Sequence, residues 1–304
     1  MFQDEIDKVE QPTIDQLFKL GWTYVTGASL APLLPSDGSP VGERGYYRDV
    51  VLVQRLEAAL RRLNPWISKE NLHKVSRELT HPIFAALMEY NQAIYKMLVG
   101  NVSVEQDLGK GRKGQTVKII DFDNVDNNEF LCCNQFKVEG INQKNIIPDI
   151  VCFVNGLPLA VIECKSPYLS SNPIAEGIDQ LRRYANFYQP ENNEGAQRLF
   201  WYNQLMVSTS RDHAKVGTIS SMAQHYGDWK DAYPFTDSDI SKLLNQENSK
   251  VATAKNLQDV PSAEYLTNAE KVAFSLESNT PEINAQQRLL MGVFTPENFL
   301  DLIQ

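Results

Sequence analysis

The stretch IPDIVCFVNGLPLAVIECKSP, at residues 147–167, constrains the fold of this chain more than any other. Two apolar runs meet at an Asn-Gly pair, which is the strongest short-range signal for a two-residue β-hairpin turn. Asp149, Glu163 and Lys165 nevertheless place ionisable groups within these runs. The sequence therefore predicts a hairpin that is buried along most of its length and carries charge at one end.

The register of this hairpin decides whether its charges meet. Side chains alternate between the two faces of a strand, so Glu163 and Lys165 project from the same face. A plain two-residue turn pairs residue 154 with residue 157, and this register puts Asp149 on the opposite face from Glu163. An odd-length loop or one β-bulge brings them to the same face. We therefore expect an odd loop or a bulge within the hairpin.

Two carboxylates that converge in an apolar hairpin are costly to bury without a cation. Mg²⁺ is commonly held by one or two carboxylates together with water and phosphate oxygens. A neighbouring lysine can orient or deprotonate a water molecule, or stabilise charge in the transition state. Asp149, Glu163 and Lys165 with a divalent metal thus fit phosphodiester hydrolysis. The alternative is a plain strand start and a solvated strand end, but the flanking runs are very apolar for a solvated edge.

The remainder of the chain predicts an α/β fold in which helices flank a mixed sheet. Apolar residues recur at helical spacing in some segments and alternate in others. From about residue 235 the sequence is polar and rich in turn residues, which predicts a connector, and the last amphipathic stretch is too short to close a core alone. The expected helices are one with Pro12 in its first turn that ends before Gly21, then 48–65, 82–100 and 173–188; the expected strands are 102–106, 116–122, 129–140, the hairpin, and 198–210.

Net charge and composition limit the classes of function. A net charge of −9 does not by itself indicate a nucleic-acid-binding protein. The Gly-rich turn GKGRKGQTVK gathers Lys110, Arg112 and Lys113, which could contact phosphates or could form a solvated hairpin tip. No apolar run approaches the ~20 residues that cross a bilayer, and no signal peptide is evident, so we expect a cytoplasmic protein.

Neither the cysteines nor the histidines show the spacing of a metal site or a disulfide framework. We expect the cysteines to be buried in strands and the histidines to be structural or exposed. These residues are Cys132, Cys133, Cys152, Cys164, His73, His81, His213 and His225.

Pro148-Asp149, a turn, and then Glu163-Cys164-Lys165 resemble the PD…(D/E)xK nuclease motif. More widely, LGWTYVTG, DFDNVDNNEFLCCNQFKVEG and IPDIVCFVNGLPLAVIECKSP are similar to the N-terminal region of the motor (restriction) subunit of type I restriction–modification enzymes, over roughly residues 5–230. The resemblance implies a restriction-endonuclease-like core at residues 1–235. Residues 236–304 would be the connector and the start of a helicase-like motor, whose lead-in GVFTPENFLDLIQ resembles.

The same resemblance implies an endonuclease that depends on Mg²⁺, for which Mn²⁺ can substitute. Asp149 and Glu163 would bind the metal and Lys165 would be catalytic. Such nucleases often add an acidic residue from the first helix; Glu10 is the first candidate and Glu5 the reserve.

A subset that resembles the RecB nuclease adds Gln-x-x-x-Tyr on the helix after the hairpin. Gln180 and Tyr184 fit this pattern, and their i, i+4 spacing places both on one helix face. Arg182 and Arg183 on the same helix are candidate phosphate contacts, with a solvated face as the alternative.

The resemblance further implies double-stranded DNA as the substrate, cut without sequence specificity of its own. The methyltransferase and specificity subunits would be its partners. No P-loop motif is present, so we expect a fragment in which ATP has no role, although the intact subunit would need it. Two alternatives stay open. The chain could be a non-catalytic module that docks the motor onto the methyltransferase core, or a RecB-like repair exonuclease, which a preference for DNA ends would reveal.

Overall fold

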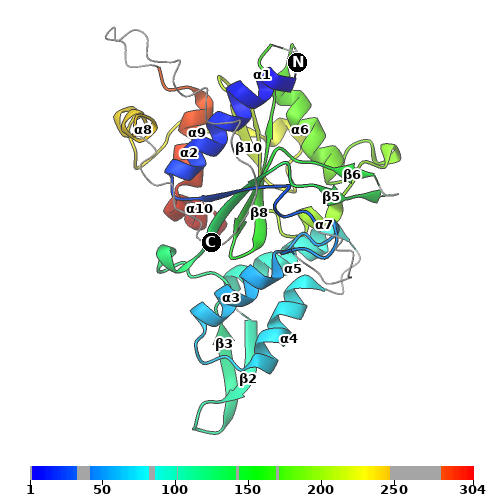
Figure 1. Cartoon of the computed structure of the whole chain (residues 1–304), viewed down its shortest axis with the longest axis vertical. Helices are drawn as coiled ribbons and strands as arrows, with labels where there is room; N and C mark the ends of the chain where they lie inside the picture. Colours follow the sequence, from blue (N-terminus) through cyan, green and yellow to red (C-terminus); the bar gives the residue numbers. More distant parts are fainter. Residues whose placement is uncertain are drawn as a thin grey trace.

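A seven-stranded mixed sheet forms the centre of the protein (Figure 1). The computed structural model describes residues 2–32, 42–81, 86–100, 102–141, 144–168, 171–246 and 282–304. The strand order is β1-β4-β7-β8-β9-β10-β11, in which β1 runs parallel to β4, β8 runs parallel to β9, and the other pairs are antiparallel. These strands are β1 (Thr23–Thr26), β4 (Phe130–Asn134), β7 (Ile150–Val154), β8 (Leu157–Cys164), β9 (Leu205–Thr209), β10 (Ala214–Gly217) and β11 (Gly227–Asp228).

Helices cover both faces of this sheet, as the sequence predicts for a restriction-endonuclease-like core (Figure 1). On one face, α1 (Phe2–Glu5), a π-helical turn η1 (Ile6–Glu10) and α2 (Gln11–Lys19) form one continuous helix, and α2 packs against α9 (Ala285–Phe294). On the other face, α6 (Pro173–Tyr184) packs against β8 and β9. The layered arrangement explains why the central strands are apolar on both sides.

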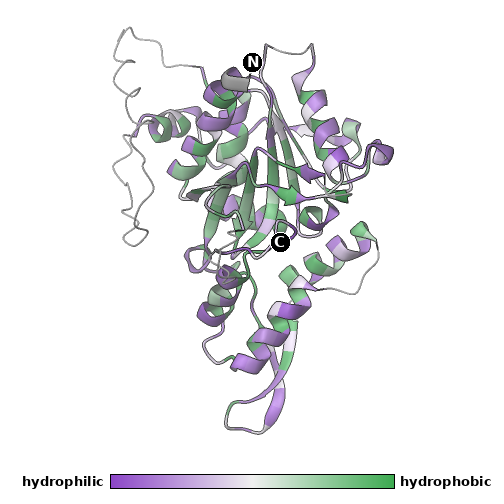
Figure 2. Cartoon of the chain, turned by 45° about the vertical axis from the view of Figure 1, so that its right-hand side comes forward, coloured by the Kyte–Doolittle hydropathy of each residue, from purple (hydrophilic) through white to green (hydrophobic). Residues whose placement is uncertain are grey.

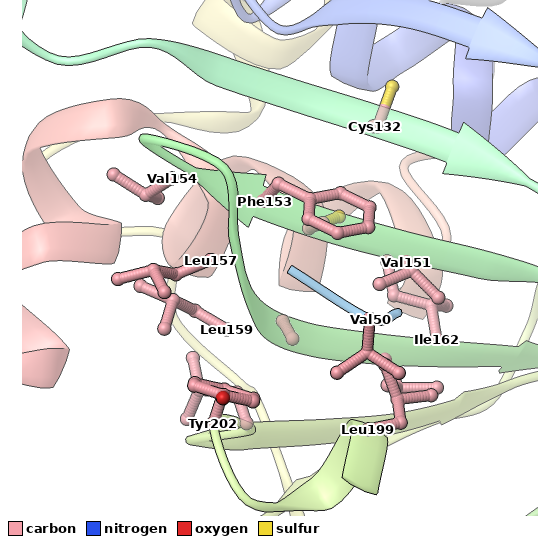
Figure 3. Close-up of a cluster of buried hydrophobic side chains, with 14 of the residues drawn as sticks. Val50, Cys132, Val151, Phe153, Val154, Leu157, Leu159, Ile162, Leu199 and Tyr202 are labelled. Atoms are coloured by element: carbon pink, nitrogen blue, oxygen red, sulfur yellow. The ribbon is translucent and has the colours of Figure 1, made fainter. Parts of the chain in front are cut away.

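The β7–β8 hairpin lies in the middle of the sheet, and every residue of both strands is buried. Asn155 and Gly156 form a two-residue turn with positive φ at both positions (51° and 80°), as a type I′ turn requires. The register then shifts between Cys152 and Phe153, so the predicted bulge is confirmed, but it lies within the strands and not in the turn. Figure 3 shows the apolar packing around the hairpin, with Val151, Phe153, Val154, Leu157, Leu159 and Ile162 close to Val50, Leu199 and Tyr202.

Three further helices and a separate hairpin lie beyond the turn end of the sheet (Figure 1). Figure 2 shows that the tip of this hairpin is hydrophilic, in contrast to the hydrophobic central sheet. The elements are α3 (Val53–Leu63), α4 (Lys69–Thr80), α5 (Leu87–Gly100), β2 (Val102–Asp107) and β3 (Arg112–Val117). The remaining strands and helices are β5 (Val138–Glu139), β6 (Asn145–Ile146), α7 (Gln197–Phe200), α8 (Asp237–Leu244) and α10 (Pro296–Ile303).

Several expected boundaries were wrong. The second strand of the small hairpin is Arg112–Val117 and not 116–122, because it pairs residue for residue with β2. The segment 198–210 begins as helix α7 and becomes β9 only at Leu205. The expected helix at 48–65 starts at Val53. Helix α4 and strand β1 were not predicted.

The C-terminal helices α9 and α10 pack into the main hydrophobic core. The Trp22 ring lies 5.2 Å from the Phe299 ring, and Trp22 Nε1 donates a hydrogen bond to the Phe294 carbonyl (2.7 Å). The predicted domain boundary at residue 235 stays a prediction, and much of the predicted connector lies outside the described residues. Residues on both sides of that boundary nevertheless share one core.

The four cysteines are free and buried, as expected. Among the described residues, none of the helices combines the length and the apolar character that crossing a bilayer requires.

Candidate active site

The charged end of the β7–β8 hairpin brings Asp149, Glu163 and Lys165 together. The bulge continues a register that sets Asp149 across from Glu163. Asp149 Oδ2 accepts a hydrogen bond from the backbone N–H of Cys164 (2.7 Å), and Lys165 Nζ donates to Glu163 Oε1 (2.7 Å). Glu163 is fully buried and Asp149 is only 9% exposed. The cluster is therefore held by two central strands and screened from water.

Burial dominates the electrostatics of this cluster. It raises the pKa of Asp149 well above its usual range, and the nearby Glu163 charge raises it further. Burial also raises the pKa of Glu163, while the Lys165 ammonium opposes that rise. For Lys165, burial disfavours the charged form, but the Glu163 and Asp149 carboxylates outweigh it and raise the pKa. Lysine therefore stays protonated, and one ammonium faces two carboxylates.

The second oxygen of Glu163 is the atom that most favours a bound cation. Glu163 Oε2 is buried and has no hydrogen-bond partner among the described residues. Such an oxygen is costly unless an ion or water compensates it. In the described parts of the chain, no three His, Cys, Asp or Glu side chains form a ready-made metal site. Asp149 and Glu163 would thus supply two ligands and leave the others to water and substrate, which is how Mg²⁺ usually binds.

The N-terminal helix adds Glu10 to the edge of the site. The two carboxylate oxygens of Glu10 accept hydrogen bonds from the amides of Asn134 (3.0 Å) and Gln135 (3.1 Å). Gln135 Nε2 also lies 3.4 Å from Asp149 Oδ1 and so bridges the two acids. Burial raises the pKa of Glu10 despite these hydrogen bonds.

Glu5 lies at the same site on the same helix. Its Oε2 accepts a hydrogen bond from the backbone N–H of Ser166 (2.9 Å), directly after Lys165. The π-helical turn spans the residues between Glu5 and Glu10, and its i→i+5 hydrogen bond from Gln11 to Ile6 widens the helix. Turns of this kind are frequent at functional sites. The geometry places both acids here, and the choice of Glu10 over Glu5 as a metal ligand stays a prediction.

Gln180 and Tyr184 on α6 face the charged cluster from the other side of the sheet. Gln180 Nε2 donates a hydrogen bond to the Tyr184 hydroxyl (2.8 Å). The pKa of Tyr184 is raised by burial and then by the Glu163 charge, so the phenol lies within the electrostatic field of the site. The pair is thus positioned to orient a group bound beside Glu163.

Gly177 allows α6 to approach the catalytic strands this closely. A Cβ at this position would lie 2.2 Å from Ser208 Oγ and 3.4 Å from Lys165 Cγ. Because real Cβ atoms do not come so near, only glycine fits without a shift of the helix or of β9.

The predicted phosphate contacts are not gathered at this site. Lys110, Arg112 and Lys113 lie in the β2–β3 hairpin, beyond the opposite end of the sheet (Figure 1). On α6, Arg183 is ion-paired with Glu194 (2.8 Å), and Arg182 lies over the ring of Tyr188. Their role in DNA binding stays a prediction.

Asn134 and Gln135 were missed from the sequence although they link the acids. They fall within the expected strand 129–140, where they look like polar residues in an alternating pattern. Gln135 instead ends β4 in a left-handed conformation (φ 50°), which is uncommon for a residue other than glycine. The only available signal was the polar Asn-Gln pair that interrupts an apolar run.

Comparison with known proteins agrees with this geometry. The family model described as type I restriction enzyme R protein N terminus matches residues 3–225. The HindI endonuclease subunit of a type I restriction enzyme from Haemophilus influenzae is 33% identical over 248 residues, which are 78% of this chain and 22% of that protein. A Methanocaldococcus jannaschii protein, provisionally named the type I restriction enzyme MjaIXP endonuclease subunit, is 30% identical over 243 residues, or 79% of this chain and 22% of that protein. The matched part of the chain thus spans about a fifth of these relatives. The chain belongs to the family of N-terminal regions of type I restriction enzyme R proteins.

Proposed function

We propose that this chain is a nuclease region that hydrolyses phosphodiester bonds of double-stranded DNA with Mg²⁺, for which Mn²⁺ can substitute. The two relatives carry names of endonuclease subunits of type I restriction enzymes. The observation that most supports the proposal is the buried Glu163 oxygen without a partner, beside a second buried carboxylate and a lysine. A scaffold would have no need to bury such an arrangement, which costs stability.

Each charged residue has a distinct part in this proposal. Asp149 and Glu163 would hold the metal, with Glu10 or Glu5 adding a carboxylate at the edge. The bound ion would polarise the phosphodiester and lower the pKa of a water molecule. Lys165, which remains an ammonium, would neutralise negative charge as it develops on the phosphate oxygens. Tyr184, fixed by its hydrogen bond from Gln180, would orient the phosphate.

We propose further that sequence choice and DNA translocation lie outside this chain. The chain matches only about a fifth of its relatives, so the specificity and methyltransferase subunits and the motor with its ATP would act alongside it. Strands of a central sheet hold the proposed catalytic groups, and no step of the chemistry above requires a base to be read.

The test uses the full-length subunit that carries this chain, assembled with its partner subunits, with Lys165→Ala. ATP hydrolysis and plasmid cleavage are measured in parallel, with Mg²⁺ and with EDTA. We expect cleavage to be lost while ATP hydrolysis persists, because only the cutting site has been changed. The matched control is Lys215→Ala, since Lys215 is also ion-paired to a carboxylate on a neighbouring strand (Asp228, 3.1 Å) but lies on β10. If Lys165→Ala cleaves as well as the control, the site is wrong and the docking role is favoured.

A further inference from the structure

A basic cleft lies beside the candidate active site, between the N-terminal helix and the start of α9. The cavity has a volume of about 390 Å³, and its lining includes Lys8, Lys19 and Arg211. Asp15 is the one carboxylate among the residues that line it. In a protein with a net charge of −9, this local excess of positive charge is unusual.

The backbone connects Arg211 directly to the catalytic strands. The Thr209 carbonyl at the end of β9 accepts a hydrogen bond from the backbone N–H of Lys165 (2.8 Å). Arg211 follows two residues later, and its own carbonyl accepts from the backbone N–H of Gln286 in α9 (3.0 Å). Arg211 is therefore fixed between the catalytic end of the sheet and α9.

Arg211 also holds a strained backbone conformation. Its φ of 71° lies in the left-handed region, which is unfavourable for a residue with a branched or long side chain. Just before it, Ser210 Oγ is buried without a hydrogen-bond partner in the described structure. A turn that maintains such costs next to a catalytic strand is typical of a functional site.

Lys8 lies close to Arg211 across the cleft, since their charges repel enough to oppose the rise in the pKa of Lys8 that Asp4 causes. Lys8 Nζ also lies 4.6 Å from the centre of the Tyr168 ring, three residues after Lys165. Two cations facing one cleft from different elements are well placed to share one anion.

The present partners of both cations are weak. Arg211 Nε is 3.8 Å from Asp212, and Lys8 Nζ is 2.8 Å from Asp4, but all four side chains are between 43% and 65% exposed. Exposed pairs of this kind contribute little, so a phosphate can replace them. Lys19 is less available, because its ammonium donates to the Leu244 carbonyl.

We propose that Arg211 and Lys8 form a clamp for a backbone phosphate of double-stranded DNA, next to the bond that is cut. The clamp rests on the proposed nuclease function and adds to it a contact that positions the substrate. Contacts to phosphates hold a duplex in register without reading its sequence. The clamp therefore suits a nuclease region that has no sequence preference of its own.

The test measures DNA binding of the full-length subunit with Arg211→Gln in a Lys165→Ala background, with Mg²⁺ present. The dissociation constant for a duplex of arbitrary sequence is followed as the salt concentration rises. We expect weaker binding, and a plot of log K against log salt that is less steep by about 0.9, the value for one lost phosphate contact. Arg211→Lys should keep the slope of the parent.

Arg61→Gln is the matched control. Arg61 is 59% exposed and lies 3.8 Å from Glu57, much as Arg211 is 50% exposed and lies 3.8 Å from Asp212, but it is on α3. The control should keep the slope of the parent. Lys8→Gln, on the exposed side of a helix, gives a second measurement with little risk to folding.

The two proposals can fail separately. If Arg211→Gln and Lys8→Gln both keep the affinity and the slope of the parent, the clamp is wrong, whatever Lys165→Ala does to cleavage. If the Lys165→Ala parent still cuts DNA, the proposed catalytic site is wrong, while the slope still decides whether Arg211 contacts a phosphate.

Discussion

At the scale of single residues, the site is defined by acids that burial has made hard to ionise. The pKa values of Asp149 and Glu163 both lie above their usual range, chiefly because burial disfavours the charged forms. A carboxyl group whose pKa is higher in the folded than in the unfolded protein stabilises the fold below its unfolded pKa of about 4. That contribution is lost as the pH rises through the folded pKa.

The stability of the metal-free protein should therefore fall as the pH is raised from about 4 towards neutral. Mg²⁺ should restore it at neutral pH, because a ligand that binds only the folded state stabilises that state. The free energy of unfolding would be measured by denaturant titration across this range, with EDTA and with Mg²⁺. Glu163→Gln should flatten the pH profile and reduce the effect of Mg²⁺.

Glu89→Gln is the control, because Glu89 is an exposed acid on α5, away from the site. It should reproduce the parent profile in both conditions. An identical profile for Glu163→Gln and the parent would show that the Glu163 carboxyl has no part in the pH dependence.

The sequence allowed Asp149, Glu163 and Lys165 to be placed together because strand periodicity and one bulge are enough to predict their meeting. It did not reveal Gln135, since the left-handed turn that aims this side chain depends on close contact with Gly27. A Cβ at Gly27 would lie 2.2 Å from the Gln135 carbonyl oxygen. Such an approach of two distant backbone segments leaves no periodic trace in the residues.

At the scale of elements, the position of α6 depends on one glycine. Gly177→Ala should destabilise the fold by about 1–3 kcal/mol, because the clash with Ser208 Oγ outweighs the roughly 1 kcal/mol that alanine adds to helix propensity. It should also lower DNA cleavage, since the helix carries Gln180 and Tyr184. Stability would be measured by chemical denaturation and cleavage on a plasmid with the assembled enzyme.

Two further variants separate the clash from a general effect of alanine. Gly100→Ala, at the end of α5, adds a Cβ that meets nothing within 4 Å, and it should not be destabilising. Gly177→Ala combined with Ser208→Ala removes the clashing oxygen and should recover part of the loss. If the double variant is no better than Gly177→Ala, the contact with Ser208 does not set the position of α6.

The elements that were mispredicted are those whose form depends on distant partners. Helix α4 has a narrow apolar stripe at Leu72, Val75 and Leu79 within a mainly polar segment, and it packs against α3 and β2. Strand β1 is short and half-exposed, and it exists because β4 pairs with it in parallel. The π-helical turn before Pro12 is likewise set by packing, so a helix that starts well before the proline could not be read from the first-turn rule.

At the scale of the whole molecule, the two ends of the chain stabilise one another. Phe299→Ala should lower the free energy of unfolding by about 3–5 kcal/mol, because the ring is fully buried against Trp22 and Phe294. Leu302→Ala on the same helix, where the side chain is 41% exposed, should change it by only about 0.5 kcal/mol. Denaturant titration followed by tryptophan fluorescence would compare the two. Equal effects would mean that α10 does not belong to the core.

The buried turn of the central hairpin also determines how this protein ages. An Asn-Gly pair in a mobile chain deamidates readily, because the glycine nitrogen can attack the side-chain carbonyl of the asparagine. Here Asn155 is fully buried, its amide nitrogen donates to Ile119 and Asn128, and its oxygen accepts from the Glu129 backbone. Ring closure would require these bonds to break and the sheet to open. Isoaspartate at position 155 would accordingly be a chemical record of the time that the chain has spent unfolded.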